Sequence, residues 1–157
     1  MSTMFDFGNG PVPARQHPNG GGWVADTATV AETAYVGPNA RVFGNVRVSG
    51  NAKVFDNAKV FGDAWVFSNA RVFGNAEVSG DAWVYDYARA SGDAQVFGGR
   101  VFGAAQVSGN AQVSGSAEVF GNARVFGNAR VLDNARVFRN ARVYGETQVR
   151  GNARVSE

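Results

Sequence analysis

Valine recurs at every sixth residue along most of this chain. The series runs from Val24 to Val96, with Ala90 as one substitution, and resumes from Val101 to Val155. A small residue, nearly always alanine, stands two positions before each valine, and the consensus unit reads Gly-Asn-Ala-Arg-Val-Phe. A period of six does not keep side chains on one face of a 3.6-residue helix, so the pattern excludes a helical repeat.

The consensus unit predicts a short β-strand followed by a corner. Strand alternation places the Ala and Val of each unit on one face and the Arg and Phe on the other. The Gly-Asn pair that follows tolerates positive φ, so the chain can turn there. Three hexapeptides close a triangular coil of 18 residues with Val and Ala inside. We therefore expect an all-β fold, a single-stranded parallel β-helix or β-solenoid, with about seven coils spanning roughly 35 Å.

The unit resembles the hexapeptide repeat of left-handed parallel β-helix proteins, in which a small residue follows an aliphatic residue four positions later. The segment from Val36 to Arg41, Val-Gly-Pro-Asn-Ala-Arg, is close to the form found in the acyltransferases of that superfamily. The later Gly-Asn-Ala-Arg-Val-Phe units are more similar to an uncharacterised bacterial and phage group of hexapeptide-repeat proteins. The resemblance covers residues 23–157 and implies a left-handed coil, while it says little about function.

Residues 1–22 lie outside the repeats and are expected to form an irregular N-terminal cap or arm, because they are rich in proline and glycine. Met4, Phe5 and Phe7 are predicted to fold over the open N-terminal coil, since terminal repeats of solenoids need covering. Residues 23–157 are expected to form the β-helix. A one-residue skip at 97–100 interrupts it, and we expect Gly99 to take the inward small position there.

The outward positions fall into three columns when 18 residues are counted per coil and the skip is allowed for. The first column holds the candidates for an interface: Trp65, Phe67, Trp83, Tyr85, Phe102, Phe120 and Phe138. The second column is rich in Lys and Arg, and the third is mixed. Stacked rings packed between Arg stems would stabilise a wall by themselves, whereas a contiguous exposed apolar surface would mark a partner site. Both interpretations stay open at this stage.

The sequence offers no catalytic, metal-binding or cofactor-binding set. It contains no cysteine and a single histidine, His17, in a Gln-His-Pro-Asn-Gly turn outside the repeats. The resemblance implies a histidine general base in the acyltransferases and three histidine ligands in their carbonic-anhydrase relatives, and the repeats hold no histidine. The aspartates of the repeats stand at corners that elsewhere hold Asn or Gly, which indicates turn roles for Asp63, Asp81, Asp93 and Asp133.

We expect a non-catalytic structural or assembly protein that self-associates into a filament or a closed oligomer. The contacts would be the aromatic column, or the coil ends, where Val149 and Val155 lie without a visible cap. Two alternatives stay open: a binding module such as a segment of a phage or surface fibre that contacts glycan, and a degenerate or unusual hexapeptide acyltransferase. The net charge of +2 disfavours nucleic acid. No apolar run is long enough for a membrane span, and the expected location is cytoplasmic, with phage association and release by lysis as an alternative.

Overall fold

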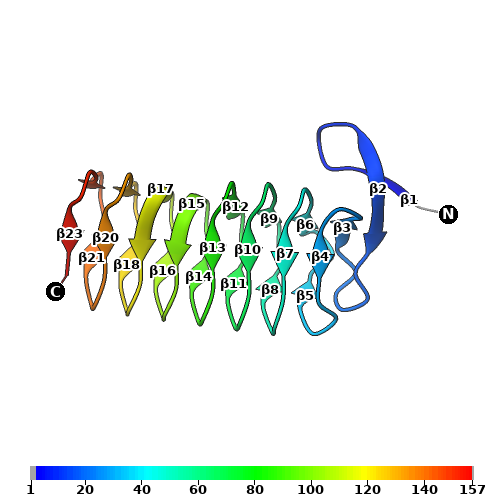
Figure 1. The fold of residues 1–157 in the computed structure, drawn as a ribbon, viewed down its shortest axis with the longest axis horizontal. Coiled ribbons are helices and arrows are strands. Elements are labelled where there is room, and N and C mark those ends of the chain that lie inside the picture. Colours follow the sequence, from blue (N-terminus) through cyan, green and yellow to red (C-terminus); the bar gives the residue numbers. More distant parts are fainter. Residues whose placement is uncertain (1–2, 157) are drawn as a thin grey trace.

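The computed structural model describes residues 3–156, which form a hexapeptide-repeat β-helix with a β-hairpin at its N-terminal end (Figure 1). Most strands are two residues long, because only the residue pair ending in the repeat valine is extended between one corner and the next. These residues include no helix, and hence no helical segment that is long and apolar enough to cross a membrane.

The strands of successive coils stack into three walls. The mixed wall consists of β3 (Trp23–Ala25), β6 (Arg41–Val42), β9 (Lys59–Val60), β12 (Glu77–Ser79), the first parts of β15 (Gln95–Val101) and β17 (Gln112–Val119), β19 (Arg130–Val131) and β22 (Gln148–Val149). The aromatic wall consists of β4 (Thr29–Val30), β7 (Arg47–Val48), β10 (Trp65–Val66), β13 (Trp83–Val84), the last parts of β15 and β17, β20 (Arg136–Val137) and β23 (Arg154–Val155). The basic wall consists of β5 (Tyr35–Val36), β8 (Lys53–Val54), β11 (Arg71–Val72), β14 (Arg89–Ala90), β16 (Gln106–Val107), β18 (Arg124–Val125) and β21 (Arg142–Val143).

Neighbouring strands of each wall are parallel and in register with the repeat. Trp65 lies opposite Trp83, 18 residues later, whereas Trp83 lies opposite Arg100 across the skip, only 17 residues later. The basic wall has seven strands, one from each coil. The predicted parallel β-helix with three hexapeptides per coil and about seven coils is therefore confirmed.

The interior is a column of valine and alanine. From Val36 to Val137 every inward valine and alanine is at most 1% exposed. Three walls converge on this interior, so the position two residues before each valine accepts a side chain no larger than alanine almost everywhere. The side chains at the inward positions thus pack the core, and only the outward positions and the corners are free for function.

The corners use left-handed backbone conformations. Gly62 has φ +73°, and a Cβ at this position would lie 2.9 Å from the backbone nitrogen of Gly80 in the next coil. Some corners carry aspartate instead, and Asp133 has φ 60°. Its carboxylate accepts a hydrogen bond of 2.9 Å from the N–H of Gly151 one coil further on. The positive φ gives Asp133 the turn role predicted from its place in the unit, and the bond links its corner to that of the next coil.

The skip removes one corner residue and straightens the chain. β15 and β17 run without a break from the mixed wall to the aromatic wall, and their pairing shifts between Gly98 and Arg100. Gly99 has φ +75° and packs against the chain at Ala117, where a Cβ would lie 2.5 Å from the Ala117 carbonyl oxygen. Gly99 thus stands in for the inward alanine, but it is half-buried and not enclosed.

The N-terminal segment is more regular than its composition suggests. β1 (Thr3–Asp6) and β2 (Pro11–Gln16) form an antiparallel hairpin, and β2 pairs antiparallel with β3 of the first coil. The expectation of an irregular arm was therefore wrong for residues 3–16. The following loop covers β5, because the Val36 carbonyl accepts from the Gly22 N–H (3.0 Å) and the Val36 N–H donates to Asn19 (3.0 Å).

Candidate functional site

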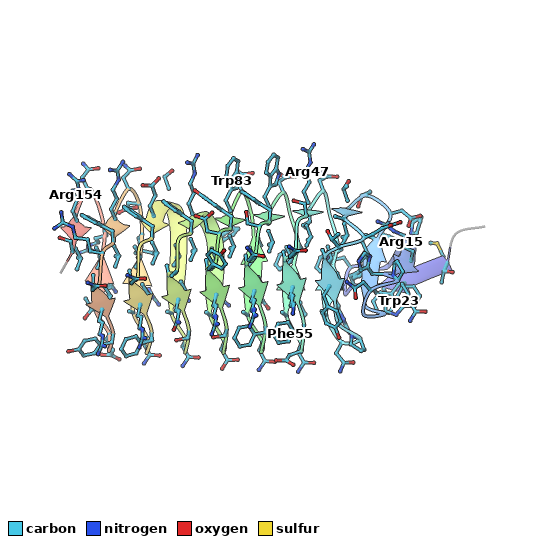
Figure 2. The ribbon with its side chains drawn as sticks, turned by 90° about the horizontal axis from the view of Figure 1, so that it is seen from below. Arg15, Trp23, Arg47, Phe55, Trp83 and Arg154 are labelled. Atoms are coloured by element: carbon cyan, nitrogen blue, oxygen red, sulfur yellow. The ribbon has the colours of Figure 1, made fainter. Side chains whose placement is uncertain are left out.

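The aromatic wall carries a four-membered stack of side chains at its outward strand positions. The indoles of Trp65 and Trp83 lie parallel, with ring centroids 4.9 Å apart and an interplanar angle of 2°. The guanidinium of Arg47 covers Trp65, and that of Arg100 covers Trp83, each at 4.9 Å from the ring centroid. Arg47 and Trp83 point away from the same side of the rod, opposite to Phe55 (Figure 2). Both flat faces of the tryptophan pair are therefore occupied by this chain itself.

A second column of rings runs beside this stack, one residue after each repeat valine. Phe67, Tyr85, Phe102, Phe120 and Phe138 stack in order, with centroid distances from 4.8 to 5.2 Å. We call this column the ring ladder. Its spacing equals the spacing between coils, so the β-helix itself sets the rings at stacking distance.

The rings of the aromatic wall are less exposed than strict alternation predicts. All the sequence-predicted interface residues on this wall, the two tryptophans and the five rings of the ladder, are half-buried. The most exposed rings lie elsewhere: Tyr87 (68%), Phe97 (63%) and Tyr144 (58%). Stacked neighbours cover both faces of Tyr85, Phe102 and Phe120, so these rings meet solvent mainly with their edges. The role of the column as an interface stays a prediction.

The skip opens a polar notch beside the tryptophan pair. The notch has a volume of about 470 Å³ and is lined by Asp81, Trp83, Gly99, Arg100, Gly115, Ser116 and Glu118. It forms where the skip deletes one corner residue and the straightened β15 and β17 leave the corner open. The missing corner residue makes this part of the wall differ from the regular repeat.

Charged groups at the notch are fixed by neighbours on adjacent coils. Glu118 forms an ion pair of 3.2 Å with Arg136. Burial raises the pKa of the Tyr85 phenol above its usual value, and the positive charge of Arg100 opposes this rise. The notch therefore presents the Glu118 carboxylate, held by this ion pair, and the Arg100 guanidinium, held against Trp83. Among residues 3–156, no cluster of three His, Asp or Glu side chains is placed to hold a metal ion.

Two of the predicted cap residues, Phe5 and Phe7, pack against each other edge to face, with ring centroids 4.8 Å apart. Phe5 stacks on Trp23 at 4.6 Å and Phe7 stacks on Phe43 at 4.9 Å, both on the outer side of the mixed wall and not over the open end of the core. Met4 is 54% exposed, so its assignment to the cap was wrong. His17 is 3% exposed and its Nε2 lies 2.8 Å from the Ala34 carbonyl oxygen, which makes it part of the cap.

The residues proposed for end stacking lie in the last coil. Val149 is 5% exposed, and Val155 is partly buried against the end of the core. At the N-terminal end, two of the three first-coil strands are already paired, β3 with β2 and β5 with the loop that contains Asn19 and Gly22. A second coil stacked on that end would find only β4 without a partner.

Sequence reasoning missed the arginine clamp and the notch. The repeat register alone pairs Arg47 with Trp65 and Trp83 with Arg100, so counting coils at the outward strand positions would have found the clamp. The notch lies at the skip, and the corner residue missing from residues 97–100 was its signal in the sequence.

Comparison with known proteins agrees with the fold. The sequence model of a family described as the YdcK β-solenoid repeat matches residues 40–54, 105–121 and 123–139. The matched segments lie within the repeats and cover less than half of the chain. No curated protein and no solved structure matches this chain. The chain is thus a β-solenoid of hexapeptide repeats, similar in these segments to YdcK-type repeats.

Proposed function

We propose that the protein is a non-catalytic structural β-solenoid that self-associates side by side through its aromatic wall. The observation that carries this proposal is the Trp65–Trp83 pair. The two indoles occupy outward strand positions that the neighbouring coils give to Arg47 and Arg100. Tryptophan and arginine are the side chains most enriched at the centres of protein interfaces.

The dimensions of the wall suit a contact between two rods. Seven coils at about 4.8 Å span roughly 34 Å, and a wall of four or five extended residues is about 15 Å wide. One wall therefore offers roughly 500 Å² per partner, which reaches the lower limit of about 1,000 Å² for a specific interface. Pre-formed stacks lower the entropy cost of binding, because the rings are already ordered in the free protein.

Side-by-side contact is favoured over head-to-tail stacking of coils. The hairpin and the loop after it occupy the outer edges of β3 and β5, so a second molecule stacked on the N-terminal coil would have to displace both. A wall-to-wall contact leaves every one of these hydrogen bonds in place.

Multi-angle light scattering tests the proposal. We expect the protein at tens of micromolar to have a mass that is a multiple of the 16.6 kDa chain. The double variant Trp65→Arg/Trp83→Arg restores the residue type of the consensus unit and should fold, and we expect it to be monomeric. Tyr144→Arg is the matched control, because it removes an exposed ring from the basic wall and should leave the mass unchanged. A monomeric wild-type protein would contradict the proposal.

A second candidate function is glycan binding at the notch. The notch brings Asp81, from the corner before β13, together with Arg100 of β15 and with Ser116 and Glu118 of β17. Such groups hydrogen bond to sugar hydroxyls. Both faces of Trp83 are covered, so a sugar would contact the indole edge or displace Arg100. Screening on a glycan array tests this function: binding that is lost in Asp81→Asn supports it, and an array without hits counts against it.

We also propose a cytoplasmic location. The chain contains no cysteine and therefore gains no disulfide from an oxidising compartment. Fractionation of the producing cell tests this, and recovery of the protein outside the cytoplasm in intact cells would contradict it.

A further inference from the structure

The ring ladder of the aromatic wall stops at Phe67, although the coils continue beyond it. One face of Phe67 stacks on Tyr85 at 4.8 Å. The next two positions of the column hold Ser49 and Ala31, which are too small to continue the stack. A slot of about 310 Å³ is left, lined by Thr29, Ala31, Arg47, Val48, Ser49, Trp65 and Phe67. It spans two coil levels, or about 10 Å along the rod.

The chain fills the equivalent position on the mixed wall with a ring of its own. There the column of rings ends at Phe43, which stacks on Phe61 at 5.0 Å, and the next position holds Ala25. Phe7 from the hairpin lies in this place, stacked on Phe43 at 4.9 Å and only 6% exposed. On the mixed wall, therefore, an aromatic side chain from a segment outside the coils occupies the end of the column, next to a small residue.

The rim of the slot on the aromatic wall favours a negative charge. Arg47 is exposed, its guanidinium lies 4.9 Å from the Trp65 ring, and no carboxylate of residues 3–156 pairs with it. The bordering strand β4 pairs with β7 alone. The cap covers β3 and β5 but leaves β4 and the slot accessible from outside, and Val30 is correspondingly half-buried.

We propose that this slot binds an aromatic side chain of a partner protein, presented on an extended segment with an acidic residue next to the ring. The ring stacks on the open face of Phe67, between Ser49 and the Trp65 edge, and the acidic side chain pairs with Arg47. The proposal does not require side-by-side association, although the slot shares Trp65 with that proposed contact.

A labelled peptide that copies residues 3–9, Thr-Met-Phe-Asp-Phe-Gly-Asn, is a suitable probe, because it carries two rings with an acid between them. Fluorescence anisotropy with the full-length protein should show saturable binding. The variant Ser49→Phe places the consensus ring in the slot and should weaken binding at least about tenfold, since the new ring occupies the stacking position. Arg47→Gln should weaken it roughly twofold to fivefold through loss of the charge.

Two controls make the test specific. Ser108→Phe makes the same consensus substitution on the basic wall and should leave the affinity within about twofold, as expected for a site that it does not touch. A peptide with both phenylalanines replaced by alanine should not bind. Thermal melting of each variant verifies that it folds.

Four outcomes would overturn the proposal. The first is the absence of saturable binding at millimolar peptide. The second is equal affinity for the wild type and Ser49→Phe, which would place the peptide elsewhere, for example at the hairpin's own site. The third is an equal loss with Ser108→Phe. The fourth is a fall in the mass of the peptide-free protein with Ser49→Phe alone, which would assign the slot to a second copy of this chain.

Discussion

Replacing Phe102 by serine removes the central ring of the ladder and should destabilise the protein strongly. Phe102 stacks on Tyr85 at 5.0 Å and on Phe120 at 4.9 Å. Each stack contributes about 0.5–1.5 kcal/mol beyond burial, and exposing a half-buried ring costs about 1 kcal/mol more. The expected loss is therefore roughly 2–4 kcal/mol. Serine occupies the same place of the unit at Ser79 and Ser108, so the backbone tolerates the substitution.

Differential scanning calorimetry measures this effect, with Phe97→Ser as the matched control. For a chain of this size the loss corresponds to a fall in Tm of roughly 5–12 °C. Phe97 occupies the same position of its unit, but it is 63% exposed and no other ring of residues 3–156 stacks on it. The control should therefore lower stability by less than about 0.5 kcal/mol. Equal losses for the two variants would refute the view that ring stacking between coils stabilises the wall.

Three further predictions concern the core, the corners and the half-buried phenol of Tyr85. Ala82→Leu should cost about 3 kcal/mol or more, because Ala82 is 0% exposed where three walls converge; retention of the wild-type Tm would contradict this. Ser68→Gly should raise stability by about 0.5–1 kcal/mol, because Ser68 has φ 61°, while Gly62→Ala should lower it; urea unfolding measures both, and the opposite signs would refute the strain. The raised pKa of Tyr85 means that the folded state holds this proton more tightly than the unfolded state does. Its stabilising contribution is present below the unfolded pKa of about 10 and is lost as the pH rises through the folded pKa. Tyr85→Phe should remove this part of the alkaline loss of stability, and an unchanged pH dependence would count against it.

The fold could be predicted from the sequence because the six-residue valine period predicts the same strand and corner in almost every unit. Each repeat valine predicts the same strand with the same inward face, so a wrong assignment in one unit does not change the assignment of the others. The assignment of residues to walls followed from counting alone, and pairs such as Trp65 with Trp83 confirm it. The skip was visible for the same reason, since a single missing residue shifts every later valine.

The hairpin was missed because prolines argue against strands. The carbonyl oxygen of Pro13 accepts a hydrogen bond of 2.9 Å from the N–H of Asp26. The N–H and C=O of one strand residue point to the same side, so the N–H that proline lacks would have pointed toward Asp26 and not toward β1. Proline therefore costs no hydrogen bond in the pairing of β1 with β2. The Asn9-Gly10 pair between the two strands indicated a hairpin, but Pro11 and Pro13 argued against the second strand.

The aromatic wall could be predicted only in part. The strand register predicts that the rings lie in a column, but it does not predict the fraction of each ring that its neighbours cover. Exposure depends on the direction of each side chain beside a corner, where strand alternation is weakest. The rings of the ladder turned edge-on to solvent, whereas Phe97, which lies between Ser79 and Ser114 in its column, has no ring to stack on and remains exposed.

Negative-stain electron microscopy of the purified protein tests the central claim most directly. Side-by-side association through the aromatic wall predicts pairs or small bundles of rods about 35 Å long, with their long axes aligned. The same images of the Trp65→Arg/Trp83→Arg variant should show separate rods. Isolated rods in the wild-type sample, or rods joined end to end into filaments, would contradict the account.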